Sequence, residues 1–272
     1  MATSTRSSKR QKTDTNADAD DKPFRLIYWL GIPGRGEHVR LAFEATGTRY
    51  TDVSNQTDEG VGAVLKQTGD DNNGDEHNPP AFAPPILQHG DDVTIWQTPN
   101  ILLYLGPKLG LVPDAQDDPV GLYHVNALAL TALDGLSNEP HDVHHPIAVI
   151  LYYEDQKTEA LRKAKDYREN RLPKFLAYFE RVLDGPASAG GEYLYGGKLS
   201  YADLVLFQTL DGVSFAFPKC VGKIRDGAKY PKVWALYERV KALEPIKNYL
   251  ASDRRLKYTL GIYRHYPELD DE

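Results

Sequence analysis

The chain has 272 residues, of which 41% are hydrophobic, so it is long enough to bury one large core or two modest ones. A formal net charge of −7 at pH 7 argues against nucleic acid or an anionic membrane surface as the main partner, and no apolar run is long enough to span a bilayer. The single cysteine, Cys220, excludes an internal disulfide framework and fits a reducing compartment, so we expect a cytoplasmic protein.

The first half of the chain alternates strand and helix patterns after a polar tail. Residues 1–22 are rich in Ser, Thr, Asp and Lys and are expected to be disordered. A helix between two strands points to a parallel crossover, so we expect a mixed sheet with helices. The predicted strands cover 24–30, 50–53, 86–87 and 93–96, and the predicted helices cover 37–46 and about 61–67.

The stretch from Ala83 to Leu105 reads as strand, turn, strand and then a helix that begins at once. Pro85 is a residue that can follow a cis peptide bond. Thr98 before Pro99 predicts a hydroxyl N-cap followed by proline at the first helical position. Since a helix N-terminus attracts carboxylates, this stretch predicts a site for a small, extended, anionic peptide.

The second half of the chain is predicted to be all-helical. The Gly- and Pro-containing segment 106–119 reads as a linker between domains, and strand signals vanish beyond it. Ser200-x-x-Asp203 before an apolar run is a capping-box pattern for a helix start. Helical periodicity covers 120–138, 147–153, 159–183, 201–216, 232–243 and 246–250.

Several motifs, in this order and spacing, resemble the cytosolic glutathione transferases of the tyrosine type (sigma, mu, pi and alpha), including fungal members. The resemblance runs from Phe24 to the end and implies an α/β plus all-α fold and a homodimer. Its domains are a thioredoxin-like domain over 23–107, a linker over 108–118 and a helical domain over 119–272. The motifs are Tyr28-Trp29, Gly34-Arg35-Gly36-Glu37-x-x-Arg40-Leu41, Pro85-x-Leu87, Gln97-Thr98-x-x-Ile101, Leu133-Asp134-Gly135 and Ser200-x-x-Asp203.

The resemblance makes Tyr28 the catalytic residue, which keeps the glutathione sulfur as a thiolate. A thiol pKa near 8.5 must fall by roughly 2 units, and one charge-assisted hydrogen bond from a phenol is an effect of about that size. The alternative is a half-buried strand tyrosine whose hydroxyl is satisfied elsewhere. The loop between Tyr28 and Arg40 is one residue longer than the family pattern. Either Gly31-Ile32 absorbs the extra residue or Tyr28 is off target.

The resemblance also implies the other glutathione contacts. Gln97 and Thr98 match residues that bind the γ-glutamyl end, and Asp134 matches an acidic residue that reaches its ammonium group across the dimer. The alternatives are an ordinary N-cap at Thr98 and a solvated helix aspartate at Asp134.

Two further contacts concern the ends of the glutathione backbone. Lys66 is the only Lys or Arg between Arg49 and Lys108, which makes it a candidate partner for the glycine carboxylate by elimination. The family pairs the residue before the cis-proline with the cysteine backbone through both N–H and C=O. If Pro85 is that proline, Pro84 supplies no N–H and glutathione binds more weakly by about 0.5–1.5 kcal/mol, unless the cis bond is displaced to Ala83-Pro84.

The run from Pro140 to Pro146 contains three histidines. Flanking prolines and the adjacency of His144 and His145 argue against a shared helical face, so we expect no metal site. Counting from Asp134, His144 falls near a family position that lines the electrophile pocket, and His141 is a second candidate. The alternative is a hydrogen-bonded histidine between the domains.

Together these features predict a glutathione transferase that conjugates the glutathione thiolate to a small hydrophobic electrophile. Glutathione is then a co-substrate, and no metal or organic cofactor is required. Two alternatives keep the fold. One is a non-catalytic binding or regulatory protein, and the other is a glutathione-dependent isomerase or peroxidase.

Overall fold

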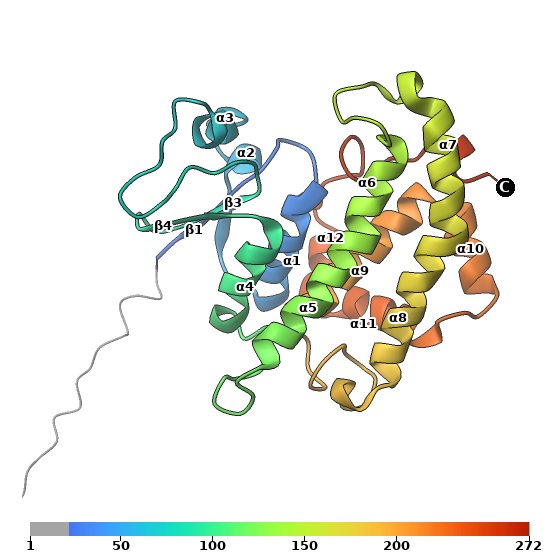
Figure 1. The fold of residues 1–272 in the computed structure, drawn as a ribbon. Helices are drawn as coiled ribbons and strands as arrows, with labels where there is room; N and C mark the ends of the chain where they lie inside the picture. Colours follow the sequence, from blue (N-terminus) through green and yellow to red (C-terminus); the bar gives the residue numbers. More distant parts are fainter. Residues whose placement is uncertain (1–21, 272) are drawn as a thin grey trace, which may run out of the picture.

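A computed structural model describes residues 22–271, so the predicted tail lies outside the described residues except for Lys22. The chain forms a four-stranded mixed sheet with its helices, followed by a region built from helices (Figure 1). The first region contains β1 (Phe24–Ile27), α1 (Glu37–Thr46), β2 (Tyr50–Asp52), α2 (Val53–Gln56), α3 (Gly62–Thr68), β3 (Ile86–His89), β4 (Val93–Trp96) and α4 (Thr98–Lys108). The second contains α5 (Gly121–Leu133), α6 (Glu139–His144), α7 (Lys157–Asp166), α8 (Leu172–Asp184), α9 (Tyr201–Ala216), α10 (Pro218–Asp226), α11 (Pro231–Ala242) and α12 (Glu244–Leu250).

The sheet has the strand order β2-β1-β3-β4, with β1 parallel to β2 and antiparallel to β3, so the predicted crossover is parallel. Side chains alternate between its two faces, as a strand period of two requires. On one face Leu26 and Leu87 pack with apolar residues of α1 and α4, and on the other Ile27 and Ile86 pack with α2 and α3. Layers of helix on both faces therefore hold the end of β1 in a fixed position.

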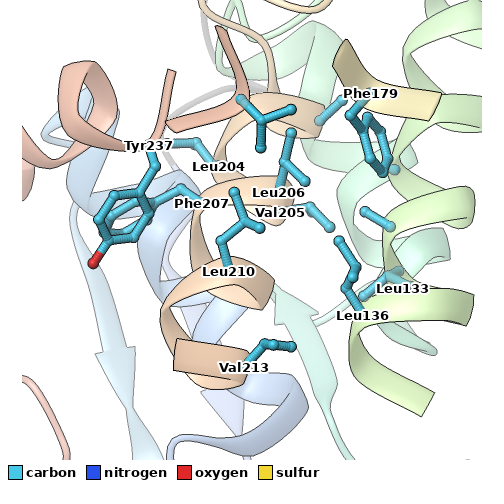
Figure 2. Close-up of a cluster of buried hydrophobic side chains, with 14 of the residues drawn as sticks. Leu133, Leu136, Phe179, Leu204, Val205, Leu206, Phe207, Leu210, Val213 and Tyr237 are labelled. Carbon is cyan, nitrogen blue, oxygen red and sulfur yellow. The ribbon is translucent and has the colours of Figure 1, made fainter. Parts of the chain in front are cut away.

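The helical region is built around α9, whose residues are almost all buried. Figure 2 shows its Leu204, Leu206 and Leu210 among side chains from α5, α8 and α11, of which Phe179 and Tyr237 are the largest labelled. Among residues 22–271 no single helix is long and apolar enough to cross a membrane. Only α9 and α10 taken together reach that length and composition, and a bend of 113° separates them.

The structure corrects three sequence predictions. The segment 147–153 is a loop and not a helix, because the side chain of Gln156 satisfies its backbone groups in a non-helical path. Gly106 and Pro107 belong to the last turn of α4 and not to a linker. Helix α4 begins at Thr98 itself, without a side-chain cap, and Gln97 is the residue that precedes it.

A buried ionic network joins α1 to the C-terminal segment. Glu37, the first residue of α1, is fully buried and accepts hydrogen bonds from Arg40 at 3.1 Å, from Arg255, and from the Tyr249 hydroxyl at 2.6 Å. Burial raises the pKa of Glu37, but the charges of Arg255 and Arg40 outweigh it and the pKa is lowered. Arg40 also pairs with Asp52 on β2 at 2.7 Å. The start of α1 is therefore bonded both to the sheet and to the C-terminal segment.

The predicted capping box at α9 is present. Asp203, fully buried, accepts hydrogen bonds from the backbone N–H of Ser200 at 2.7 Å and of Leu194 at 2.8 Å, while the Ser200 side chain caps the helix. We expect Asp203→Ala to lower the free energy of unfolding by about 3 kcal/mol, because it leaves these buried N–H groups without an acceptor. Urea unfolding measures this, with the exposed Asp226→Ala as control. A loss no larger than that of the control would contradict the role given to Asp203.

Candidate functional site

The candidate site is organised around the backbone of Arg35. Tyr28 directly follows β1, and its side chain is only 6% exposed because helices cover both faces of the sheet at that end. Its hydroxyl oxygen accepts a hydrogen bond from the Arg35 N–H at 2.9 Å. This bond uses an acceptor lone pair of the hydroxyl, so the proton of the phenol remains available to a ligand.

Two glycines allow the loop to close over the Tyr28 ring. Gly34 has a left-handed φ of +43°, and a Cβ there would overlap the Tyr28 hydroxyl. A Cβ at Gly36 would lie 2.7 Å from the ring atom Cγ of the same tyrosine. Since real Cβ atoms do not approach other atoms so closely, any larger residue at these positions must displace the ring.

The loop between Tyr28 and Arg35 contains a turn at Leu30–Gly31. Gly31 has a φ of +69°, and its N–H donates a hydrogen bond to Asn55 Oδ1 at 2.9 Å. The turn lies between Tyr28 and the Arg35 backbone, which still meet. Gly31 and Ile32 thus lie in a turn that leaves the contact between Tyr28 and the Arg35 backbone intact.

Thr98 contacts the backbone of the same residue, Arg35, at its carbonyl group. Its hydroxyl donates to the Arg35 carbonyl at 3.2 Å, so this side chain ties the start of α4 to the loop and does not cap its own helix. Gln97 has a φ of 72°, a conformation that costs a non-glycine residue about 1–3 kcal/mol. The free N–H groups of α4 begin here, on the segment that Thr98 bonds to the Arg35 backbone, which makes the place suitable for a carboxylate.

The Arg35 side chain extends the site towards the helical region. It donates to Asn138 Oδ1 at 2.6 Å, and Asn138 in turn donates to Asp134 at 3.4 Å. Asp134 is therefore linked to Tyr28 and Thr98 through two intermediates, although its own side chain is exposed. Asn138 was not predicted from the sequence; the available signal is its position one helical turn after Asp134.

Other predicted residues stand apart from this group. The Pro84–Pro85 bond is cis, as predicted for Pro85, and leads directly into β3. Lys66 is exposed near the end of α3, and no hydrogen bond or ion pair within residues 22–271 joins it to Tyr28, Arg35 or Thr98.

The two predicted histidines lie on α6, and only one of them is exposed to any extent. His144 is buried and donates from Nε2 to the Ile262 carbonyl at 2.9 Å, while its Nδ1 meets Nδ1 of His145 at 2.5 Å. Burial lowers the pKa of His144 to about 3, so it is a neutral structural histidine. His141 is partly exposed, and the charge of Arg35 contributes to lowering its pKa, after burial. Among residues 22–271 no cluster of three such side chains is arranged to hold a metal ion.

The electrostatics of the site favour hydrogen-bond donation by Tyr28. Burial raises the pKa of the phenol, and the hydrogen bond and charge of Arg35 offset this only in part. The phenol is therefore protonated at neutral pH and acts as a donor and not as a base. Such a donor beside a helix N-terminus stabilises an anion that is placed between them.

His38 is a second residue that the sequence did not single out. It lies in the first turn of α1, is fully buried, and neither ring nitrogen has a hydrogen-bond partner among the described residues. Burial, followed by the charge of Arg35, lowers its pKa to about 3. The histidine is therefore neutral in the fold at all ordinary pH values.

Comparison with known proteins adds to this geometry. Residues 141–253 match the family model described as "Glutathione S-transferase, C-terminal domain". Glutathione S-transferase P 1 of Xenopus laevis is 28% identical over 239 residues, which cover 86% of this chain and 95% of that protein. The class-mu 26 kDa isozyme 1 of Fasciola hepatica is 25% identical and covers 88% and 91%.

Solved structures give the same picture of the fold. The pi-class glutathione S-transferase of Onchocerca volvulus superposes with a TM-score of 0.59 at 23% identity and covers 83% of this chain and 91% of that one. The predicted fold class, a thioredoxin-like region followed by a helical transferase region, is thereby confirmed. The relatives named here come from a frog, a flatworm and a nematode, so they do not support a fungal placement.

Gly34 and Gly31 offer a matched test of the closed loop. Both have a left-handed φ, but a Cβ at Gly31 would meet nothing within 4 Å. We expect Gly34→Ala to cost about 1–3 kcal/mol more than Gly31→Ala in urea unfolding, because only the former overlaps Tyr28. Adding Tyr28→Phe to Gly34→Ala recovers part of this cost. Equal costs for the two alanine variants would show that the loop does not close on the tyrosine.

The buried histidines predict a pH dependence of stability. Their pKa falls from an ordinary 6.5 to about 3 in the fold, so below pH 6.5 only the unfolded chain binds these protons. The free energy of unfolding is therefore unaffected above this pH and decreases on acidification, by about 1.4 kcal/mol per pH unit for each histidine.

Replacement of one histidine isolates its part of this slope. His38 is packed near Arg35, Glu37 and Arg255, and His38→Leu removes one of the two proton uptakes. We expect the decrease between pH 6 and 4 to lose about 1.4 kcal/mol per unit in that variant, and to stay the same in the control variant of the exposed His77, His77→Leu. An unchanged slope in His38→Leu would contradict its neutral state in the fold.

Proposed function

We propose that this chain, a homologue of the pi- and mu-class glutathione S-transferases at about 25% identity, is a cytoplasmic enzyme that conjugates glutathione to a hydrophobic electrophile. The observation that carries the proposal is the meeting of Tyr28, the Arg35 backbone and Thr98 at the N-terminus of α4. A hydrogen-bond donor for a thiolate and a place for a carboxylate are thus found side by side.

Tyr28 supplies the activation step. Its phenol stays protonated, accepts from the Arg35 N–H and donates its own proton to the glutathione sulfur. The thiol proton leaves to solvent, and the thiolate attacks the electrophile. One such hydrogen bond lowers the thiol pKa by about 1–2 units, which gives a useful fraction of thiolate at pH 7.

The remaining groups bind the peptide part of glutathione. The N–H groups at the start of α4, with Gln97 and Thr98, receive the γ-glutamyl carboxylate, and Asp134 is its charged partner for the ammonium group. Pro84 offers its carbonyl oxygen to the cysteine N–H but has no N–H of its own. Lys66 is the proposed partner of the glycine carboxylate.

The electrophile is proposed to bind beside Ile32. The segment 260–262 passes close to this loop, since a Cβ on Gly261 would lie 3.2 Å from Ile32 Cγ2. Leu30 is 53% exposed and Leu260 is 64% exposed on the same two segments. An apolar acceptor is the ligand that these side chains suit. Of the two candidate histidines on α6, His141 is the one that is partly exposed, and we propose it as the titratable group for this ligand.

A homodimer is part of the proposal. Phe82 is 86% exposed in the loop before β3, and Tyr123 and Leu130 are exposed on α5. Apolar side chains exposed to this extent are typical of surfaces that a second subunit covers.

One observation favours the non-catalytic alternative. The Tyr28 side chain is almost completely buried beneath residues 34–36, so a thiol reaches its hydroxyl only if the loop yields. A protein that binds glutathione without conjugating it would have this property. An isomerase or peroxidase on the same fold differs in the electrophile and not in the activation step.

Tyr28→Phe tests the proposal. We expect it to lower kcat/KM for 1-chloro-2,4-dinitrobenzene about 10- to 100-fold and to raise the pKa of the bound thiol, because a charge-assisted hydrogen bond is lost. The rate is followed against pH with saturating glutathione. Binding of glutathione itself, measured by calorimetry, changes much less.

Tyr50→Phe is the matched control, because Tyr50 lies on the neighbouring strand and its hydroxyl donates to Glu44 at 3.1 Å. Its rate and pH profile should equal those of the wild type. An unchanged rate in Tyr28→Phe would remove Tyr28 from its role. Binding of glutathione without conjugation in the wild type would favour the non-catalytic alternative.

A further inference from the structure

The connection between α6 and α7 presents apolar side chains to solvent. Among its residues Ile147 is 58% exposed, Val149 71%, Ile150 91% and Tyr152 78%. Isolated exposed apolar residues are common, but four within six positions gather apolar side chains on one short exposed segment, which is typical of a binding surface. We refer to residues 147–152 as the apolar loop.

A single buried side chain holds the apolar loop in shape. Gln156 accepts hydrogen bonds from the N–H groups of Ile147 at 2.9 Å and Ala148 at 3.3 Å, and it donates to the carbonyl groups of Ala148 at 3.1 Å and Leu151 at 3.2 Å. The side-chain amide of Gln156 thereby supplies hydrogen-bond partners for the backbone N–H and carbonyl groups on the inner side of the loop. The side chains are left pointing outward on a preorganised frame, and a ligand that lies on them does not have to order the loop first.

The apolar loop lies next to the proposed electrophile site. It starts after His145, and the neighbouring His144 is bonded to the Ile262 carbonyl at 2.9 Å. The adjoining Gly261 lies against Ile32 in the loop that follows Tyr28. Figure 1 shows this connection, the loop after β1 and the C-terminal segment at the same end of the molecule. Leu30 and Leu260 are exposed on the two segments that meet at Ile32, so apolar side chains are exposed both at the proposed electrophile site and on the apolar loop.

We propose that the apolar loop is an outer subsite for the aliphatic chain of a long-chain electrophile. This inference rests on the proposed function and specifies its substrate class: an electrophilic head that reaches the thiolate, followed by an unbranched apolar tail. The tail lies across Leu260 or Leu30 and then on Val149 and Ile150. Aliphatic side chains without hydrogen-bonding groups suit a ligand that has none.

Charge argues against a membrane as the occupant. Glu154 and Asp155 follow the apolar loop directly, and Asp142 is exposed before it. The basic side chains nearby are accompanied by carboxylates: Lys157 is paired with Glu268 at 2.6 Å, and Arg162 and Lys163 lie beside Pro146 together with Glu159 and Asp166. Arg264 is the further cation near His145. An anionic lipid surface would be repelled by these carboxylates. An uncharged tail brought in by a head group that binds elsewhere is not affected by them.

S-alkylglutathiones test the inference, because they place a chain of chosen length on the sulfur. We expect the Kd of the wild-type protein, measured by calorimetry, to fall about 15-fold from S-hexyl- to S-decylglutathione. Each methylene group that becomes fully buried lowers the Kd about fourfold, and each one that is covered on one side only lowers it about twofold. S-methylglutathione provides the baseline for the peptide part.

The variant Val149→Ser/Ile150→Ser removes the outer surface and changes only exposed side chains. We expect its decyl-to-hexyl preference to fall to about threefold, with S-methylglutathione binding unchanged. Val120→Ser, 51% exposed before the far end of α5, is the matched control and should keep the full preference. A variant with the wild-type preference, or a wild type with no preference, would overturn the inference while leaving the proposed function in place.

Two further results distinguish a failure of this inference from a failure of the proposed function and from a lipid contact. If no S-alkylglutathione binds, the proposed function fails and the outer subsite fails with it. If the wild type binds phosphatidylcholine vesicles and Val149→Ser/Ile150→Ser does not, the apolar loop is a lipid contact, and the inference is wrong.

Discussion

The buried carboxylate of Glu37 is the constraint on which the rest of the structure depends. A charge that has left water must be paired, and here it is paired by Arg40 of its own helix and by Arg255 of the C-terminal segment. Separation of the two regions would take Arg255 and the Tyr249 hydroxyl away from this carboxylate and leave it only Arg40. The start of α1 is therefore held from both regions, and Arg35 lies two residues before it.

The candidate site is held together by backbone atoms as well as by side chains. The backbone of Arg35 donates its N–H to the Tyr28 hydroxyl and accepts a hydrogen bond at its carbonyl from the Thr98 hydroxyl. These backbone hydrogen bonds do not depend on which side chain residue 35 carries. They do leave no room for a Cβ against the Tyr28 ring, which is why Gly34 and Gly36 flank Arg35. Because Glu37 fixes the start of the following helix, the Arg35 backbone has little freedom to separate from Tyr28 and Thr98.

Much of the fold follows from local patterns. The periodicity of 201–216 and the Ser200-x-x-Asp203 box predict α9 to the residue, since a long apolar helix and its cap are both encoded locally. The segment 147–153 was mistaken for a helix because its apolar residues match helical spacing, whereas its path depends on Gln156, a later residue. Helix α10 was missed because it is short and begins with Pro218 directly after α9.

The site could be predicted only where its residues are contiguous motifs. Tyr28 and Thr98 were identified as candidates, but their shared partner Arg35 acts through its backbone, for which a sequence carries no signal. His38 was overlooked because histidine in a helical face is ordinary until its burial is known. The pairing of Arg35 with Asn138 depends on a contact between residues 103 positions apart.

The dependence of the apolar loop on Gln156 has a consequence for how such a protein diversifies. Because the frame is fixed from within by an amide, the outward side chains at 147, 149, 150 and 152 contribute little to the path of the backbone. Substitutions at exposed positions of this kind usually change the free energy of unfolding by less than about 0.5 kcal/mol. The inner residues around Arg35 have no such freedom, so new ligand preferences would arise at the rim of this molecule while its chemistry stays the same.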